Sequence, residues 1–187
     1  VGYKPSFGRI SRDGVLLFSN SMDHVGVCTR DLDVLEKVLP LLVDGWRFQK
    51  PKVNKNTSIG IPKGSYINLS KPNVLKQFFN TIQLLEEKFD IKNLELVRDI
   101  ESYNSKIDKI TFAELYKVHS VWFEKYKELY GPKVRETIEA GKKISSEDFT
   151  SLTNRSRKDR KLLQMLMIEK GIDIWIAPVA PDVAPFG

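Results

Sequence analysis

The strongest constraint on the fold is a strand, a helix and a second strand in the middle of the chain. Residues 57–61 form a short apolar run that stops at Pro62, as a buried strand would. The Ser-Lys-Pro tract at 70–72 then places a cap and an early proline before a long amphipathic helix. Residues 94–100 follow as the second strand. Because parallel strands need such a helical crossover, this order predicts a parallel sheet covered by helices.

Helix signals also occur on both sides of this unit. Thr29 is expected to cap a helix that continues to about residue 43. Farther along, Thr111 and Glu114 form a capping box, in which a hydroxyl and a carboxylate satisfy early backbone N–H groups. The helix that they begin is expected to end sharply at Gly131.

The C-terminal third continues the alternation of helix and strand. A short helix is expected to stop at Gly141, and Ser145 or Ser146 to cap a long helix that Gly171 closes. Residues 173–177 then read as an apolar strand. Taken together, these signals predict an α/β fold with a mixed sheet and covering helices.

Composition places the chain among ordinary globular proteins. Its 187 residues are 41% hydrophobic and 29% charged, which suits one domain with a substantial core. No apolar run approaches the roughly 20 residues that a membrane-spanning helix needs. The lone cysteine, Cys28, cannot form an internal disulfide. That cysteine count favours a reducing, cytoplasmic location.

The net charge of +6 comes from 30 basic against 24 acidic residues. Lysines are spread along the helical segments, and the one concentrated patch is the basic cluster of Arg155, Arg157, Lys158, Arg160 and Lys161. One hypothesis is a non-catalytic interaction domain that binds nucleic acid through this cluster. Such a surface usually interleaves its basic residues with exposed aromatics, and none lies among these residues. A solvated helix face is therefore the favoured interpretation, and nucleic acid is not an expected partner.

The most specific pattern is at the start of the chain. Residues 2–14 read G-x-K-P-S-x-G-R-x-S-x-x-G, and residues 21–26 read S-x-D-x-x-G. These motifs resemble the amidase signature family, serine hydrolases that cleave carboxamides. Three later tracts resemble the same family in the same order: S-I-G-I-P at 58–62, Y-G-P-K-V-R at 130–135 and D-I-W-I-A-P-V-A-P at 173–181.

The resemblance implies a site whose reacting groups are elsewhere. Members of the family use a Ser–cis-Ser–Lys triad that precedes the G-x-K-P motif, and none of its three residues stands in this sequence. We therefore expect residues 1–187 to be a single partial domain that lacks the upstream catalytic part and the final C-terminal segment. The implied substrate is a small-molecule amide, and we expect no metal and no other cofactor. The oligomeric state is left open.

Ser21, Asp23 and His24 supply all three residue types of a serine protease triad. Residues at positions i, i+2 and i+3 of one loop cannot align as a relay, however. We expect the Ser21 hydroxyl and the Asp23 carboxylate to bond loop backbone instead. The resemblance implies that this loop lies near the active site. Ser21 and Asp23 are thus the candidate substrate-binding or supporting residues, and no residue of the chain is a candidate catalytic group.

Two functions within the family remain open, and for either the isolated chain is expected to be inactive. One is a stand-alone amidase that releases a carboxylate and ammonia or an amine. The other is the glutamine-using glutaminase subunit of a tRNA amidotransferase. That subunit usually carries a loop with tyrosine, arginine and glycine before the helix expected at Thr111. Residues 103–110 do not show this composition, so the stand-alone amidase is preferred.

Overall fold

The computed structural model describes residues 1–47, 56–96 and 99–184. They form two compact units, each assembled from two stretches of the chain. The first unit comprises Val1–Lys50 and Asp108–Phe149, and the second comprises Pro51–Ile107 and Thr150–Gly187. Helices α3 (Ile100–Tyr126) and α5 (Ser146–Lys170) contribute residues to both units.

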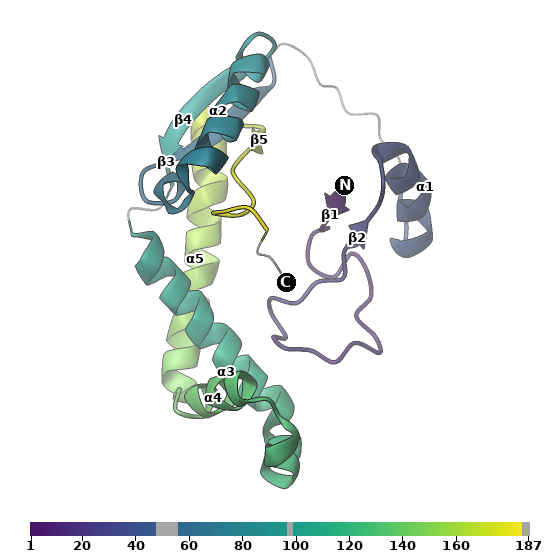
Figure 1. Cartoon of the computed structure of the whole chain (residues 1–187), viewed down its shortest axis with the longest axis vertical. Coiled ribbons are helices and arrows are strands. Elements are labelled where there is room, and N and C mark those ends of the chain that lie inside the picture. The colour runs from purple at the N-terminus through teal and green to yellow at the C-terminus, as the bar shows by residue number, and fades with distance from the viewer. Residues whose placement is uncertain (48–55, 97–98, 185–187) are drawn as a thin grey trace. The chain divides into compact units, whose positions relative to one another are not determined.

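The second unit contains a three-stranded parallel sheet. Strand β3 (Ser58–Lys63) is central, between β4 (Asp90–Glu95) and β5 (Ile174–Trp175). Helix α2 (Pro72–Glu86) connects β3 to β4 and follows the short helix η1 (Ile67–Leu69). Figure 1 shows α2 running alongside these two strands. The predicted strand–helix–strand unit, its parallel pairing and the proline in the first turn of the helix are confirmed.

Apolar side chains of α2 cover β3. Ile59, Ile61 and Ile82 are 5% exposed or less and form the centre of this core. The residues packed around them are Phe78, Leu85, Phe89, Ile91 and Ile176. The helix predicted to be amphipathic therefore packs an apolar face on the sheet. Phe79, next to Phe78 on α2, is 49% exposed.

The predicted strand boundaries were less accurate. Strand β3 passes through Pro62, which is tolerated because β5 pairs only with Ile59 and Gly60 and leaves one edge of β3 without a described partner there. Strand β4 begins at Asp90 rather than at residue 94 because its register pairs Ser58 with Asp90. Of the predicted strand 94–100, residues 97–98 lie outside the described residues, and Ile100 begins α3.

Strand β5 brings an aromatic ring over a glycine. Gly60 and Trp175 are register partners, and a Cβ on Gly60 would lie 2.4 Å from the Trp175 ring. The ring therefore occupies the space that a side chain at position 60 would need. The indole Nε1 of Trp175 is buried and has no hydrogen-bond partner among the described residues.

A polar network joins the sheet to the end of α5. The Ser58 hydroxyl donates to Asp90 Oδ2 at 2.9 Å, and the Lys92 ammonium lies 3.3 Å from the same oxygen. Lys92 Nζ also donates to the carbonyls of Lys170 at 2.7 Å and Gly171 at 3.1 Å, so it satisfies acceptors at the C-terminus of α5. The Ser58 hydrogen bond, followed by Lys92, lowers the pKa of Asp90.

Because of Asp90, this network should make stability decrease as the pH falls into the acid range. Because its folded pKa is depressed, Asp90 stabilises the fold above its unfolded pKa of about 3.9, and that contribution is lost as pH falls through the folded pKa. We expect Asp90→Asn to lower the urea midpoint at pH 6 and to change it less at pH 3. Asp13→Asn, at an exposed position, is the control. Equal losses for Asp90→Asn at both pH values would contradict the assignment.

The first unit begins with a two-stranded antiparallel ribbon, β1 (Gly2–Tyr3) with β2 (Val27–Cys28). Helix α1 (Leu32–Leu42) follows and buries Leu35 and Leu39 against Ile10 and the residue after the helix, Val43. Helix η2 (Lys127–Leu129) and helix α4 (Pro132–Lys142) come after α3. Leu115 and Phe123 of α3 form a second core with Ile138 of α4.

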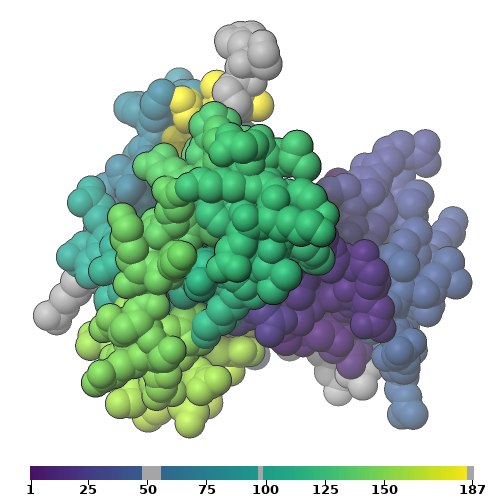
Figure 2. Space-filling view, turned by 90° about the horizontal axis from the view of Figure 1, so that it is seen from below, coloured from purple at the N-terminus to yellow at the C-terminus, as the bar shows by residue number. Residues whose placement is uncertain are grey.

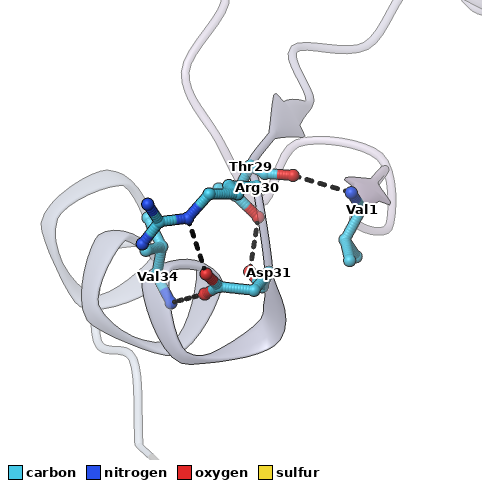
Figure 3. Close-up of polar contacts among 5 residues, drawn as sticks. All are labelled: Val1, Thr29, Arg30, Asp31 and Val34. Carbon is cyan, nitrogen blue, oxygen red and sulfur yellow. Dashed lines mark hydrogen bonds and ion pairs between the residues drawn. The ribbon is translucent and has the colours of Figure 1, made fainter.

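Asp31, not Thr29, caps α1. Asp31 Oδ1 accepts from the Val34 N–H at 2.9 Å, and this bond is the main reason that the pKa of Asp31 is lowered (Figure 3). Thr29 instead exchanges backbone hydrogen bonds with Val1 beside the ribbon, at 2.7 and 2.8 Å. Both residue types favour the cap position, but the backbone of Thr29 is paired with Val1, so Asp31 is the residue that caps the helix.

The predicted capping box at Thr111 and Glu114 is wrong. Helix α3 begins at Ile100, where Asp99 Oδ1 accepts from the Ser102 N–H at 2.9 Å, so both residues lie in the helix interior. The Thr111 hydroxyl donates to the Asp108 carbonyl at 2.9 Å. The Glu114 side chain points away from its own helix backbone, and its carboxylate accepts a hydrogen bond from Ser21.

Gly141 lies inside α4 rather than ending it. A Cβ there would lie 2.0 Å from the Phe112 carbonyl oxygen, so this glycine allows α4 to approach the backbone of α3. The predictions for α5 are confirmed: the Ser145 hydroxyl accepts from the Asp148 N–H at 3.0 Å, and Gly171 follows the last turn with a φ of 57°.

Candidate functional site

The candidate site is the loop of residues 18–23, and Asp23 organises it from within. Asp23 Oδ2 accepts from the backbone N–H of Phe18 at 2.6 Å and of Ser19 at 3.0 Å. The Asp23 N–H in turn donates to the Ser19 carbonyl at 3.0 Å. These bonds close the loop into a compact turn, as aspartate side chains commonly do. The prediction that the Asp23 carboxylate would bond loop backbone is confirmed.

Ser21 has a different partner from the one predicted. Its hydroxyl donates to Glu114 Oε2 at 2.9 Å, and its backbone N–H donates to the same oxygen at 2.9 Å. The Ser19 hydroxyl makes a third bond to this oxygen at 2.5 Å. Glu114 thus receives every donor that Ser21 offers. The expectation that the Ser21 hydroxyl would bond loop backbone is wrong, because a carboxylate from α3 is the stronger acceptor.

His24 does not join Ser21 or Asp23. Its Nδ1 lies 2.6 Å from the Met22 carbonyl oxygen, and its ring packs edge-on against Phe7 with centroids 5.4 Å apart. The serine, the aspartate and the histidine of the tract therefore each face a different group. Nothing in this arrangement provides a base for the Ser21 hydroxyl of the kind that a serine nucleophile needs.

Arg12 connects the loop to the G-x-K-P segment. Its Nη1 donates to the Asn20 carbonyl at 2.7 Å and lies 3.4 Å from the Asp23 carbonyl. The guanidinium also stacks over Phe7, 4.5 Å from the ring centroid. Both motifs of the N-terminal pattern are consequently held as one structure, with Arg12 and Glu114 each bonded to the loop.

Glu114 is the residue of this site that sequence reasoning missed. It is 7% exposed, while Ser19 beside it is fully buried. None of the ion pairs between described residues includes Glu114, so neutral donors alone satisfy its carboxylate. In Figure 2, atoms of the N-terminal segment (purple) lie next to green atoms, and the bonds of Ser19 and Ser21 to Glu114 place the 18–23 loop on α3. In the sequence, Glu114 stands between two apolar residues, Ala113 and Leu115, and the structure shows both of them to be buried.

Among residues 1–47, 56–96 and 99–184, no group of three or more histidine, cysteine, aspartate or glutamate side chains is arranged to hold a metal ion. His119, a possible ligand by residue type, is buried; its Nδ1 lies 3.0 Å from the Tyr130 hydroxyl.

The basic cluster lies away from this loop in sequence, on the part of α5 that belongs to the second unit. Arg155, Arg157, Lys158, Arg160 and Lys161 are all exposed. Their placement agrees with the favoured interpretation of a solvated helix face.

Within the part of the chain that the structure describes, we find no helix with the length and apolar content that a bilayer crossing requires.

Comparison with known proteins decides the family. The family model described as Amidase matches residues 1–186. The chain belongs to the Amidase family. This assignment confirms the resemblance of the N-terminal motifs, and it accounts for the later tracts that follow in the same order.

Individual relatives agree with this assignment. A glutamyl-tRNA(Gln) amidotransferase subunit from Geobacter sp. (strain M21) is 26% identical over 98% of this chain and 45% of its own length. The corresponding mitochondrial protein of Schizosaccharomyces pombe is 30% identical over 61% of this chain and 28% of its own. The chain spans less than half the length of these Amidase relatives.

A solved structure shows the fold. The protein described as "Crystal structure of amidase" superposes with a TM-score of 0.82 and 24% identity, over 98% of this chain and 41% of that one. At this identity the likeness concerns the fold alone. It confirms the predicted α/β class and its assignment to an amidase signature-type fold.

Proposed function

We propose that the protein carrying this chain is an amidase-type hydrolase. It adds water across a carboxamide C–N bond and releases a carboxylate and ammonia or an amine. The observation that supports this most directly is the Amidase match over residues 1–186. We further propose that these residues are part of one amidase-type domain that acts on a small-molecule amide. The lone cysteine supports a reducing, cytoplasmic location.

In the proposed chemistry, the reacting groups are residues that this chain does not contain, and this chain contributes a loop beside them. A serine hydroxyl attacks an amide only when a base takes its proton, and in this family a lysine does so through a second serine. Those three groups have no counterpart among the 187 residues. In our proposal, Ser21 and Asp23 contribute by giving the loop beside the reacting groups its shape, through Glu114 and the Phe18–Ser19 backbone.

A comparison of two preparations tests this proposal. The protein as its gene encodes it should release ammonia or an amine from simple carboxamides, because it would contain the missing serines and lysine. The isolated 187-residue chain should release none above the uncatalysed background. Product release can be followed by a coupled ammonia assay and by mass spectrometry of the carboxylate. Hydrolysis by the isolated chain at an enzyme-like rate would overturn our assignment of the site.

A second candidate is the glutaminase subunit of a tRNA amidotransferase. The name of the Geobacter relative, which is similar over nearly the whole chain, favours it. Both candidates hydrolyse an amide, so they differ in substrate and in dependence on other molecules. Glutamine hydrolysis that requires charged tRNA and a copurifying partner protein would favour the second candidate. Turnover of simple amides by the protein alone would favour the first.

A further inference from the structure

We propose that Glu114 is a positioning residue for amide hydrolysis, acting by fixing the 18–23 loop against α3. This inference rests on the proposed function. It does not require Glu114 to touch the substrate or the reacting atoms. The effect of Glu114 is carried by the three bonds that Ser19 and Ser21 make to its Oε2 atom.

The first support is the number and convergence of these bonds. Two hydroxyls and one backbone N–H meet a single carboxylate oxygen at 2.5 to 2.9 Å. Glu114 as a whole is 7% exposed, and a buried carboxylate must be compensated by such donors, because an unsatisfied buried charge is strongly unfavourable. The loop therefore has one well-defined position in which Glu114 is satisfied.

The second support is that the acceptor, the Glu114 carboxylate, belongs to a long helix. Glu114 lies in the interior of α3, a helix of 27 residues, with Ala113 and Leu115 buried on either side. Sites held by regular elements are placed more accurately than sites held by loops alone. The bonds connect residues 93 to 95 positions apart in the chain, so they fix the loop to a distant and rigid support.

The third support is the division of roles within the site. Among the described residues, the Asp23 carboxylate accepts only from backbone N–H groups of its own loop, which sets the loop's internal shape. Arg12 reaches Asn20 from the G-x-K-P segment, which is itself N-terminal. Among the hydrogen bonds between described residues, those to Glu114 alone tie Ser19 and Ser21 to a helix. Removing the carboxylate would leave the turn formed but free to shift.

The test compares three variants in the protein as its gene encodes it. Glu114→Ala removes all three bonds, and Glu114→Gln keeps a carbonyl oxygen that can still accept from them. Glu124→Gln makes the same charge change at an exposed position of α3 and serves as the control. We expect kcat for a simple carboxamide to fall roughly 100-fold in the alanine variant and about tenfold in the glutamine variant. The change in KM should be smaller than the change in kcat.

Hydrogen exchange supplies a readout that is independent of turnover. The Ser21 amide should exchange faster in both Glu114 variants than in the control, because its acceptor is lost or weakened. Should the alanine variant fail to fold, the glutamine variant carries both measurements. Faster exchange together with a lower kcat supports the inference.

Two results would overturn it. Unchanged Ser21 exchange in the glutamine and alanine variants would show that Glu114 does not hold the loop. Faster exchange with unchanged kcat would show that holding the loop does not matter for hydrolysis. If the unmodified protein hydrolyses no amide at all, the proposed function fails and the positioning role with it. The exchange data would then still show whether Glu114 holds the loop, so the two failures remain distinct.

Discussion

Gly141→Ala should destabilise the first unit by about 3 kcal/mol, near the upper end of the usual range for overpacking. The added Cβ would lie 2.0 Å from the Phe112 carbonyl oxygen and 3.2 Å from the Ala113 nitrogen, both backbone atoms that no rotamer change can move away. Helix α4 must therefore withdraw from α3. That shift would also disturb Ile138, which is fully buried against Leu115 and Phe123.

The measurement is urea unfolding followed by circular dichroism of the purified chain. Gly2→Ala is the matched control, because a Cβ at Gly2 meets only the Cys28 sulfur at an ordinary 3.9 Å. We expect the control to unfold within about 0.5 kcal/mol of the unmodified chain. A Gly141→Ala chain as stable as this control would mean that α4 does not pack on α3 at the distance described.

Ile61→Ala should cost the second unit a similar amount, about 3 kcal/mol, by the opposite mechanism. Ile61 is 1% exposed at the centre of the β3 core, where Ile59 and Ile82 flank it. Truncation removes buried methyl and methylene groups and leaves a cavity that the sheet and α2 cannot fully close. The loss follows from packing alone, since no polar group at this position changes.

Ile168→Ala is the control for this substitution. It deletes the same atoms from α5, where Ile168 is 82% exposed, and should leave the free energy of unfolding nearly unchanged. Calorimetry and urea titration can both compare the two variants. If the loss were equal for Ile61 and Ile168, burial in the β3 core would not be the cause.

Local patterns in the sequence were sufficient for much of the fold. The order of strand, amphipathic helix and strand correctly indicated a helix packed on a parallel pair of strands, because parallel strands need such a crossover, and Phe78, Ile82 and Leu85 make that packing. The start of α3 could not be found in the same way. Thr111 and Glu114 have the composition of a capping box, yet Asp99 caps the helix well before them. The spacing of Thr111 and Glu114 alone cannot distinguish a capping box from two residues inside a helix whose side chains bond to other groups.

The same distinction explains what could be predicted of the site. The bonds of Asp23 span four or five residues, so a rule about turns was enough to anticipate them. The partner of Ser21 is 93 residues away on α3, and no local rule could indicate it. The sequence around Glu114 shows only a charged residue between two apolar ones, Ala113 and Leu115, and does not identify its partner.

Because its ring lies over Gly60, Trp175 can report on the second unit through its fluorescence. The other two tryptophans, Trp46 and Trp122, belong to the first unit. With Trp46 and Trp122 both changed to phenylalanine, the tryptophan fluorescence would come only from Trp175 beside β3. Its wavelength would then reveal when β5 separates from the sheet, independently of events in the first unit.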